Sequence, residues 1–245
     1  MTRLLALLFA ILALAPARAH AQERAEGDGR AAWAAAGAGL LAGAILLDRT
    51  VDGAVPDGGG TRWEWASDAL NYGGRPHYAV ALLGAAYAGG RLAEAPEVSR
   101  AAAHVGAALL AAGAANGALK YALGRERPSA TDDNARFAPF TADNRWQSFP
   151  SGHAVVAFSL AASVSEEARR PWVTALTYGG AALVGWSRVY EDKHWTSDVV
   201  GGALVGIAAG RGTVRLLHRA RDEDADGGAR LTLLPNGFAV TVPTR

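Results

Sequence analysis

Long apolar stretches alternate with short polar segments along most of this chain, and each apolar stretch is long enough to form a helix. This pattern predicts helices at 33–47, 77–92, 98–123, 154–168, 171–187 and 195–217, with a shorter amphipathic helix within 63–72. Proline begins or precedes several of them, as Pro76, Pro96 and Pro171 do. We therefore predict an all-α fold, a helical bundle of about six helices.

The polar segments divide the chain further. The stretch 124–149 is a charged, proline-containing loop between two apolar helices, and a loop of that length is typical of a functional segment. Residues 219–229 form a charged connector, and 231–242 read as two short strands around Asn236-Gly237, which predicts a short C-terminal β-hairpin.

The N-terminus has the pattern of a signal peptide. Arg3 precedes an apolar run at 4–14, and small residues at 17, 19 and 21 follow Pro16. The run is short for a bilayer span, which needs roughly 20 residues, although an uncleaved first anchor is the alternative. We expect an exported, cell-envelope protein with a signal peptide at 1–21, a helical domain at 22–218, and the connector and hairpin at 219–245.

Composition excludes several classes of function. The chain of 245 residues has a net charge of +1 and no long Lys/Arg run, so no nucleic acid partner is expected. It has no cysteine, which excludes disulfides, thiolate nucleophiles and cysteine-based metal sites. Half of its residues are hydrophobic, many of them Ala and Gly, which suits tightly packed helices in water or in lipid.

The first cluster of chemical interest lies where the helix at 98–123 ends. Lys120 falls in its last turn, Gly124 is a plausible C-cap, and Arg127-Pro128 follow. Cations here could simply complement the helix dipole, or they could bind an anion.

The second cluster, Pro150-Ser151-Gly152-His153, comes directly before an apolar helix. Ser151 can cap the helix, and Gly152 allows a ligand to approach the backbone. A helix N-terminus attracts anions, so the cluster is either an ordinary capped start with a surface histidine or an anion site that contains His153.

The third cluster runs from Ser187-Arg188 to His194 and Asp198. His194 and Asp198 are four residues apart, so on a helix they would share a face, and a carboxylate on one ring nitrogen leaves the other basic and nucleophilic. A local surface pair is the alternative, but Asp198 enters an apolar helix, where a carboxylate needs a partner.

Taken together, Lys-x6-Arg-Pro (120–128), Pro-Ser-Gly-His (150–153) and Ser-Arg-x5-His-x3-Asp (187–198) resemble the three-part signature of the type 2 phosphatidic acid phosphatase family. That family shares its site with bacterial non-specific acid phosphatases and vanadium haloperoxidases. Every signature position is filled, over roughly residues 100–210.

The resemblance implies roles for these residues. His194 is the implied nucleophile that forms a phosphohistidine, Asp198 orients it, and His153 is the acid that protonates the leaving group and then activates water. The implied phosphate ligands are Lys120, Arg127, Ser151, Gly152 and Arg188.

No metal or other cofactor is expected at this site, because three cations can bind the phosphate. The sequence shows no evident cluster of carboxylates and histidines with metal-ligand spacing. Asp132, Asp133 and Asp143 in the long loop could bind a cation, but a solvated loop is the preferred interpretation.

The substrate depends on whether the bundle lies in a membrane. Most predicted helices offer about 15–18 apolar residues, near the lower limit for a span. We favour membrane association and a lipid phosphate, such as phosphatidate or an isoprenyl or lysolipid phosphate; the alternative is a soluble periplasmic acid phosphatase for small organic phosphates. Three helices precede the first motif, so a site that faces the periplasm requires that at least one earlier segment does not cross.

Aromatic residues beside the motifs leave two interpretations open. They could line an apolar entrance to the site, or they could be packing residues; they are Trp146, Phe149, Trp186, Tyr190 and Trp195. A haloperoxidase is less favoured because the chain is short for one, and a non-catalytic lipid-binding protein is less favoured because no motif position is degraded. The oligomeric state does not follow from the sequence.

Overall fold

The computed structural model describes residues 28–54, 63–225, 230–234 and 237–241, so the predicted signal peptide lies outside the described residues. Within these ranges the chain forms seven α-helices rather than about six, because the short amphipathic segment also becomes a helix. They are α2 (Asp28–Asp52), α3 (Glu64–Gly73), α4 (Pro76–Leu92), α5 (Pro96–Leu123), α6 (Gly152–Ala168), α7 (Pro171–Tyr190) and α8 (Thr196–Ala225). Two short 3-10 turns, Pro128–Ala130 and Asn144–Trp146, interrupt the long loop.

Proline and glycine set many of the helix boundaries. Proline occupies the first turn of α4, α5 and α7, where its missing N–H costs no hydrogen bond. Gly124 ends α5 in the left-handed conformation, with φ of 57°, and donates its N–H to the carbonyl of Lys120, which confirms the predicted C-cap.

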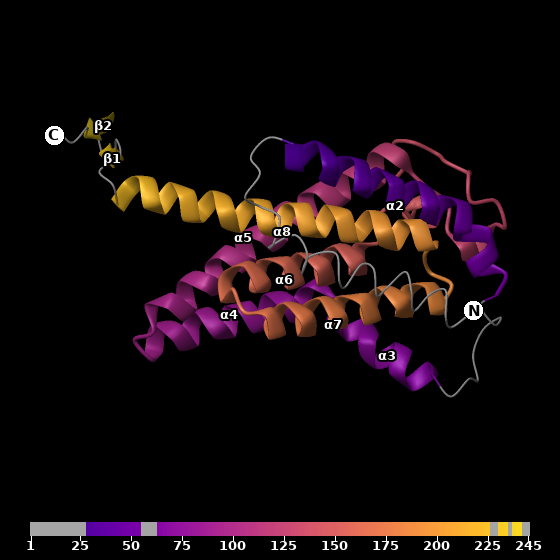
Figure 1. Cartoon of the computed structure of the whole chain (residues 1–245), viewed down its shortest axis with the longest axis horizontal. Coiled ribbons are helices and arrows are strands. Elements are labelled where there is room, and N and C mark those ends of the chain that lie inside the picture. Colours follow the sequence, from indigo (N-terminus) through magenta and orange to yellow (C-terminus); the bar gives the residue numbers. More distant parts are fainter. Residues whose placement is uncertain (1–27, 55–62, 226–229, 235–236, 242–245) are drawn as a thin grey trace.

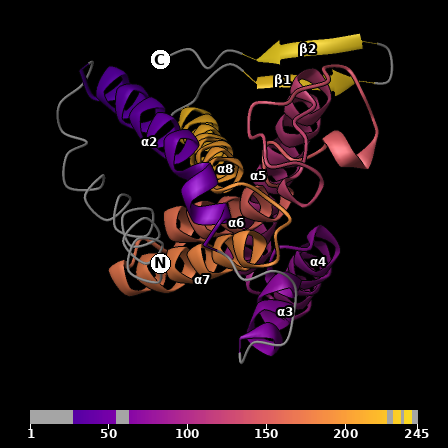
Figure 2. The same ribbon diagram turned by 90° about the vertical axis from the view of Figure 1, so that its right-hand side faces the viewer.

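Helix α6 lies at the centre of the bundle, packed against α5, α7 and α8 (Figures 1 and 2). Helix α2 lies along α8, α4 pairs with α5, and α3 contacts α7. The core cluster consists mainly of alanine and valine, with Phe158 and Tyr178 as its large members.

Glycines on α8 let this helix approach α6 closely. A Cβ at Gly206 would lie 2.6 Å from the carbonyl oxygen of Val155, and one at Gly210 would lie 2.8 Å from that of Ser159. Since no larger residue fits at these positions, the small-residue composition of α8 determines how close the two helices come.

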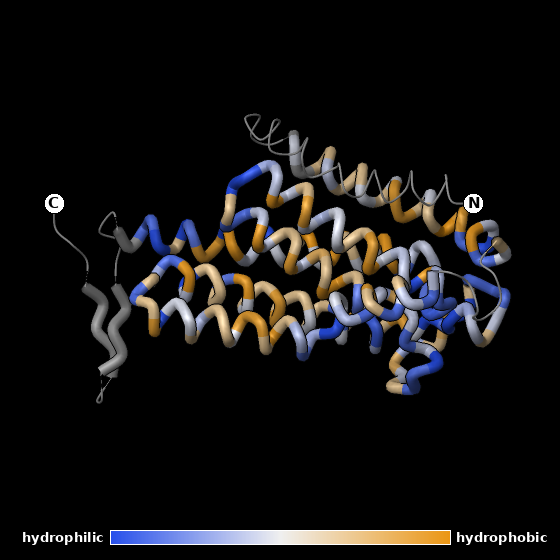
Figure 3. Tube along the Cα trace, turned by 90° about the horizontal axis from the view of Figure 1, so that it is seen from below, coloured by the Kyte–Doolittle hydropathy of each residue, from blue (hydrophilic) through white to orange (hydrophobic). Residues whose placement is uncertain are grey.

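The bundle has two distinct ends. At the motif end, α5 and α7 finish, α6 and α8 begin, and the long loop lies across the helices (right in Figure 1). At the opposite end, α4 turns into α5 and α6 turns into α7. Polar residues gather toward the ends, above all the motif end, while the bundle between them is largely apolar or neutral (Figure 3).

Two helices are longer than predicted. Helix α2 does not end at Asp48-Arg49, because Asp48 is buried and paired with other polar groups and so does not force the chain into water. Helix α8 continues to Ala225, through much of the segment expected to be a connector, since Arg, Asp and Glu are acceptable on an exposed helix.

Two short strands follow α8. β1 (Arg230–Leu234) pairs antiparallel with β2 (Gly237–Thr241), and Leu234 lies opposite Gly237. Gly237 is therefore the first paired residue of β2, although the turn had been expected to centre on Asn236-Gly237. The strands lie beyond the opposite end of the bundle and far from the three motifs (Figure 1).

Three helical segments among the described residues are long and apolar enough to cross a membrane: Ala31–Asp52, Pro96–Leu123 and Thr196–Glu223. Large apolar side chains also face outward along the bundle, such as Leu46, Leu82 and Leu110, which are 82%, 71% and 74% exposed. A surface of this kind favours contact with lipid over contact with water.

Candidate active site

The three sequence motifs meet at the motif end. The backbone N–H of Ser151 donates to the carbonyl of Asp198 at 2.9 Å, which joins the second motif to the third. Arg127 donates through Nη1 to the carbonyl of Lys193 at 2.9 Å, which joins the first motif to the third. A Cβ at Gly152 would lie 3.9 Å from Cε of Lys120, so the first and second motifs are also in contact.

His194 lies in the turn before α8 and not on the helix, contrary to the sequence expectation. Its Nδ1 is 3.5 Å from Oδ2 of Asp198, which sits in the first turn of α8. Asp198 also accepts the backbone N–H of Trp195 at 3.0 Å, so it binds the turn that carries His194. The carboxylate thus holds the Nδ1 edge of the ring, and Nε2 remains the reactive nitrogen.

Burial keeps both motif histidines neutral. It lowers the pKa of His194 to about 4, although the carboxylate of Asp198 acts in the opposite direction. Burial also lowers the pKa of His153 to about 3, with further contributions from the charges of Arg188, His194, Arg75 and Arg127. Both imidazoles are therefore uncharged near neutral pH in the free protein, as a nucleophile and a water-activating base require.

Several buried polar atoms at this end have no hydrogen-bond partner among the described residues: Oγ of Ser151, Nε2 of His153 and Nε of Arg188. Ser151 occupies the N-cap position of α6, but its side chain makes no capping bond, contrary to expectation. Buried donors without partners are costly, so a group that holds three of them together is suited to an anionic ligand.

The three motif cations differ in how they are held. Lys120 donates to the carbonyl of Gln147, and Arg127 donates to the carbonyl of Asn144 at 3.0 Å. Burial, together with the charge of Arg188, lowers the pKa of Arg127. Arg188 forms an ion pair with Glu191. All three cations are anchored by backbone or side-chain groups near the histidines.

A buried polar network behind Asp198 was not predicted from the sequence. Arg125 is 3% exposed and donates to Asp198 at 2.7 Å and to Asp48 of α2 at 2.8 Å. Ser197 donates to Asp48 through both its backbone N–H, at 2.8 Å, and its hydroxyl, at 2.6 Å. The only signal in the sequence was Asp48 itself, a carboxylate at the end of an apolar stretch, which needs a partner.

Other residues near the site were also missed. Ser148 donates its hydroxyl to Asp198 at 2.5 Å. A Cβ at Gly74 would clash with Cβ of His153 at 2.6 Å, so the junction between α3 and α4 lies directly on this histidine and brings Arg75 to the site. No local pattern marks Gly74 or Arg75, because their sequence distance from the motifs is large.

The structure distinguishes between the alternatives for the neighbouring residues. Trp195 is 1% exposed and donates Nε1 to the carbonyl of Glu126, so it is a packing residue. Trp186 stacks on Tyr190 with centroids 4.9 Å apart, and Phe149 packs where Gly201 leaves room. In the long loop, Asp133 pairs with Arg49 at 3.2 Å, which agrees with a solvated loop.

The chain also matches known proteins. Residues 101–222 match the family model described as the PAP2 superfamily. A lipid A 1-phosphatase of Porphyromonas gingivalis is 39% identical over 93 residues, which are 37% of this chain and 18% of that protein. A putative undecaprenyl-diphosphatase, YbjG of Escherichia coli, is 35% identical over 82 residues, which are 34% of this chain and 39% of that protein.

Among solved structures, the crystal structure of Aquifex aeolicus LpxE aligns with a TM-score of 0.53 and 22% identity, over 70% of this chain and 94% of that chain. At this identity the likeness concerns the fold. The matched parts of the two curated relatives are well under two thirds of their length. The family match ends at residue 222, so it gives no support to the C-terminal hairpin.

Proposed function

The chain belongs to the PAP2 superfamily through residues 101–222, and on that premise we propose that it is a metal-independent lipid phosphatase that acts through a phosphohistidine. The observation that carries this proposal is the group of buried, unpartnered polar atoms of Ser151, His153 and Arg188 beside the His194–Asp198 pair. These atoms surround a space suited to a tetrahedral anion.

In the first step, Nε2 of His194 attacks phosphorus, an N–P bond forms, and the P–O bond to the alcohol breaks. His153 gives its proton to the departing alkoxide. Because this imidazole is neutral in the free protein, the proton arrives with the substrate, whose negative charge also raises the pKa of His153. Lys120, Arg127 and Arg188 hold the phosphate oxygens and stabilise the charge of the transition state.

In the second step, the neutral His153 accepts a proton from water while the water oxygen attacks phosphorus. The N–P bond breaks, inorganic phosphate leaves, and His194 is neutral again. The N–H of Gly152, at the start of α6, is a further donor to the phosphate.

The network behind Asp198 acts as a positioning unit. Arg125 binds both Asp198 and Asp48, and it therefore fixes the carboxylate that orients His194. Since Asp48 belongs to α2 and Arg125 to the long loop, the network also ties these two segments to the start of α8.

An apolar groove favours a lipid substrate over a small organic phosphate. A pocket of about 350 Å³ between α3, α6 and α7 is lined by apolar residues that include Leu70, Ala157 and Val184. Ala157 lies one helical turn after His153, and Val184 lies one turn before Arg188, so the groove adjoins the site. It suits an acyl or isoprenyl chain, in keeping with the lipid names of the two relatives.

We place the motif end on the periplasmic face of a membrane. Helices α2 and α5 run toward this end and α4 runs away from it, so α2 then begins on the inner side. A leader cleaved on the outer face requires instead that α2 does not cross completely, as the helix count from the sequence anticipates. The chain has no cysteine, so labelling of Phe140→Cys in whole cells with an impermeant maleimide tests this orientation; protection of that residue would reverse it.

The function is tested with the full chain in detergent and EDTA. Release of inorganic phosphate is measured from phosphatidate, undecaprenyl pyrophosphate, lipid A and p-nitrophenyl phosphate. We expect turnover of at least one lipid in preference to p-nitrophenyl phosphate, and its loss in His194→Ala. Undiminished activity in that variant contradicts the mechanism, and preference for p-nitrophenyl phosphate contradicts the lipid assignment.

A further inference from the structure

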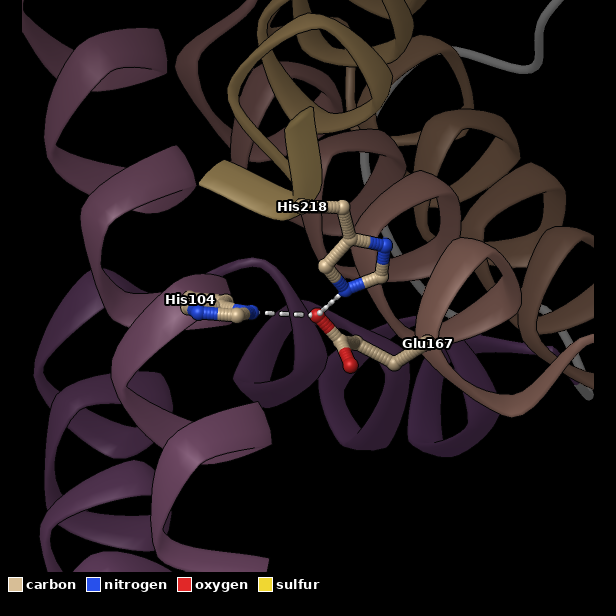
Figure 4. Close-up of side chains that lie close together, drawn as sticks. All are labelled: His104, Glu167 and His218. Atoms are coloured by element: carbon tan, nitrogen blue, oxygen red, sulfur yellow. Dashed lines mark hydrogen bonds and ion pairs between the residues drawn. The ribbon is translucent and has the colours of Figure 1, made fainter. Parts of the chain in front are cut away.

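Three side chains meet at the opposite end of the bundle: His104 of α5, Glu167 of α6 and His218 of α8 (Figure 4). Nδ1 of His104 donates to Oε1 of Glu167 at 2.7 Å, and Nε2 of His218 donates to the same oxygen at 3.0 Å. The three side chains are between 13% and 23% exposed. Both imidazole rings thus point at one carboxylate oxygen from different helices.

This cluster is separate from the phosphatase site. His104 precedes Lys120 on α5 by about 24 Å of helix, and Glu167 follows His153 on α6 by about 21 Å. None of the three takes part in the proposed reaction, so a function must be sought elsewhere.

We propose that His104, Glu167 and His218 bind one divalent transition metal ion, with Zn²⁺ the best fit. Two imidazoles and one carboxylate are a common zinc ligand set, with a water in the fourth position. The three ligand atoms already lie within 4.8 Å of one another. Around a tetrahedral zinc ion, neighbouring ligand atoms are about 3.3 Å apart, so binding requires shifts of an ångström or so.

The protonation states also suit a metal. Each ring nitrogen that faces Glu167 carries a proton in the described arrangement, and binding moves that proton to the other ring nitrogen. For His218 this places N–H at Nδ1, which lies 3.3 Å from Nη2 of Arg169. Arg169 is exposed at the C-cap of α6, so its side chain can turn away at small cost.

A metal here would join α5, α6 and α8 where the loops between helices are short. The role is structural, because binding to the folded state alone stabilises that state. The alternative is a purely hydrogen-bonded cluster, in which one carboxylate accepts two imidazole N–H groups and no metal binds.

The test uses the full chain, purified in detergent without a polyhistidine tag and stripped with EDTA. Zinc chloride is titrated by calorimetry, with magnesium chloride as the comparison ion, and the melting temperature is measured in parallel. We expect one zinc per chain and a rise of about 5 °C at saturating zinc, with no response to magnesium. Absence of stoichiometric zinc binding overturns the proposal.

Variants locate the ion. His104→Asn, Glu167→Gln and His218→Asn should each abolish stoichiometric binding, whereas His77→Asn, at an exposed histidine outside the cluster, should retain it. Equal binding by the cluster variants overturns the assignment. If a variant does not fold, zinc X-ray absorption of the unmodified chain decides, since two imidazole ligands are expected and fewer than two contradict the site.

Discussion

The two ends of the helix bundle both bring histidine and carboxylate together, but they do so in different chemical states. At the motif end, His153, Ser151 and Arg188 have buried polar atoms with no partner among the described residues. At the opposite end, His104 and His218 both donate to Glu167. The first arrangement is incomplete without a ligand, as a catalytic site is, while the second is complete and requires only small shifts to accept a metal.

The electrostatic surroundings differ in the same way. Cations dominate the motif end, where Lys120, Arg127 and Arg188 accompany the two histidines. Each of the two clusters has a carboxylate, but Asp198 is neutralised by Arg125, whereas Glu167 faces two imidazoles. The comparison teaches that one end of the bundle suits an anion and the other a cation, and it can be tested from both sides.

The largest effect is expected from His153→Ala. Loss of the general acid and base should lower kcat by about 10²- to 10⁴-fold for a lipid substrate, with a smaller loss for p-nitrophenyl phosphate, whose leaving group needs no proton. Phosphate release is the measurement, and His104→Ala is the matched control at the other end. A similar loss in His104→Ala would break the distinction between the two ends.

A loss of about 10²-fold is expected when the positioning network is altered. Arg125→Lys keeps the charge but cannot bind Asp48 and Asp198 with one planar fork, so kcat should fall while KM changes little. Arg49→Lys, in an exposed ion pair, is the control. A change in KM alone would indicate that Arg125 acts on substrate binding instead of on His194.

The pH dependence concerns the motif end. His194 must be neutral to attack, and burial lowers its pKa to about 4, so kcat/KM should be constant from neutral pH to about 5 and fall below about 4. An acid limb near the ordinary value of 6.5 would show that His194 is not buried as described.

Thermal stability should follow the same titration. The folded-state pKa of His194 lies below its unfolded value, so the unfolded chain binds more protons between pH 6.5 and about 4. This contribution to stability is present above pH 6.5 and decreases as the pH falls toward 4. The melting temperature of His194→Asn should therefore fall less over this range than that of the unmodified chain.

The smallest effect is expected from His104→Asn in the absence of metal. It removes one of two hydrogen bonds to Glu167, which should cost about 1 kcal/mol and lower the melting temperature by about 2–4 °C. Phosphate release should be unchanged. Loss of catalysis would mean that the two ends are coupled through α5, α6 or α8.

Much of the motif end could be predicted because its chemistry is concentrated in short segments. Ser151, Gly152 and His153 are consecutive, and His194 and Asp198 are four residues apart, so local spacing alone indicated an anion site and an oriented imidazole. The type of most helices could also be predicted, since proline and glycine act on the local backbone. The sequence by itself determined the fold class and the residues of the three motifs.

Tertiary structure decided everything that depends on contacts between distant segments. Arg125 reaches Asp48 across 77 residues, and His104 reaches Glu167 across 63. These contacts arise because α5, α6 and α8 pack around one core, and packing between helices is set by side-chain shape along their whole length and not by local spacing. For this reason His104, Glu167 and His218 carried no signal in the chain, yet they form one cluster in the folded protein.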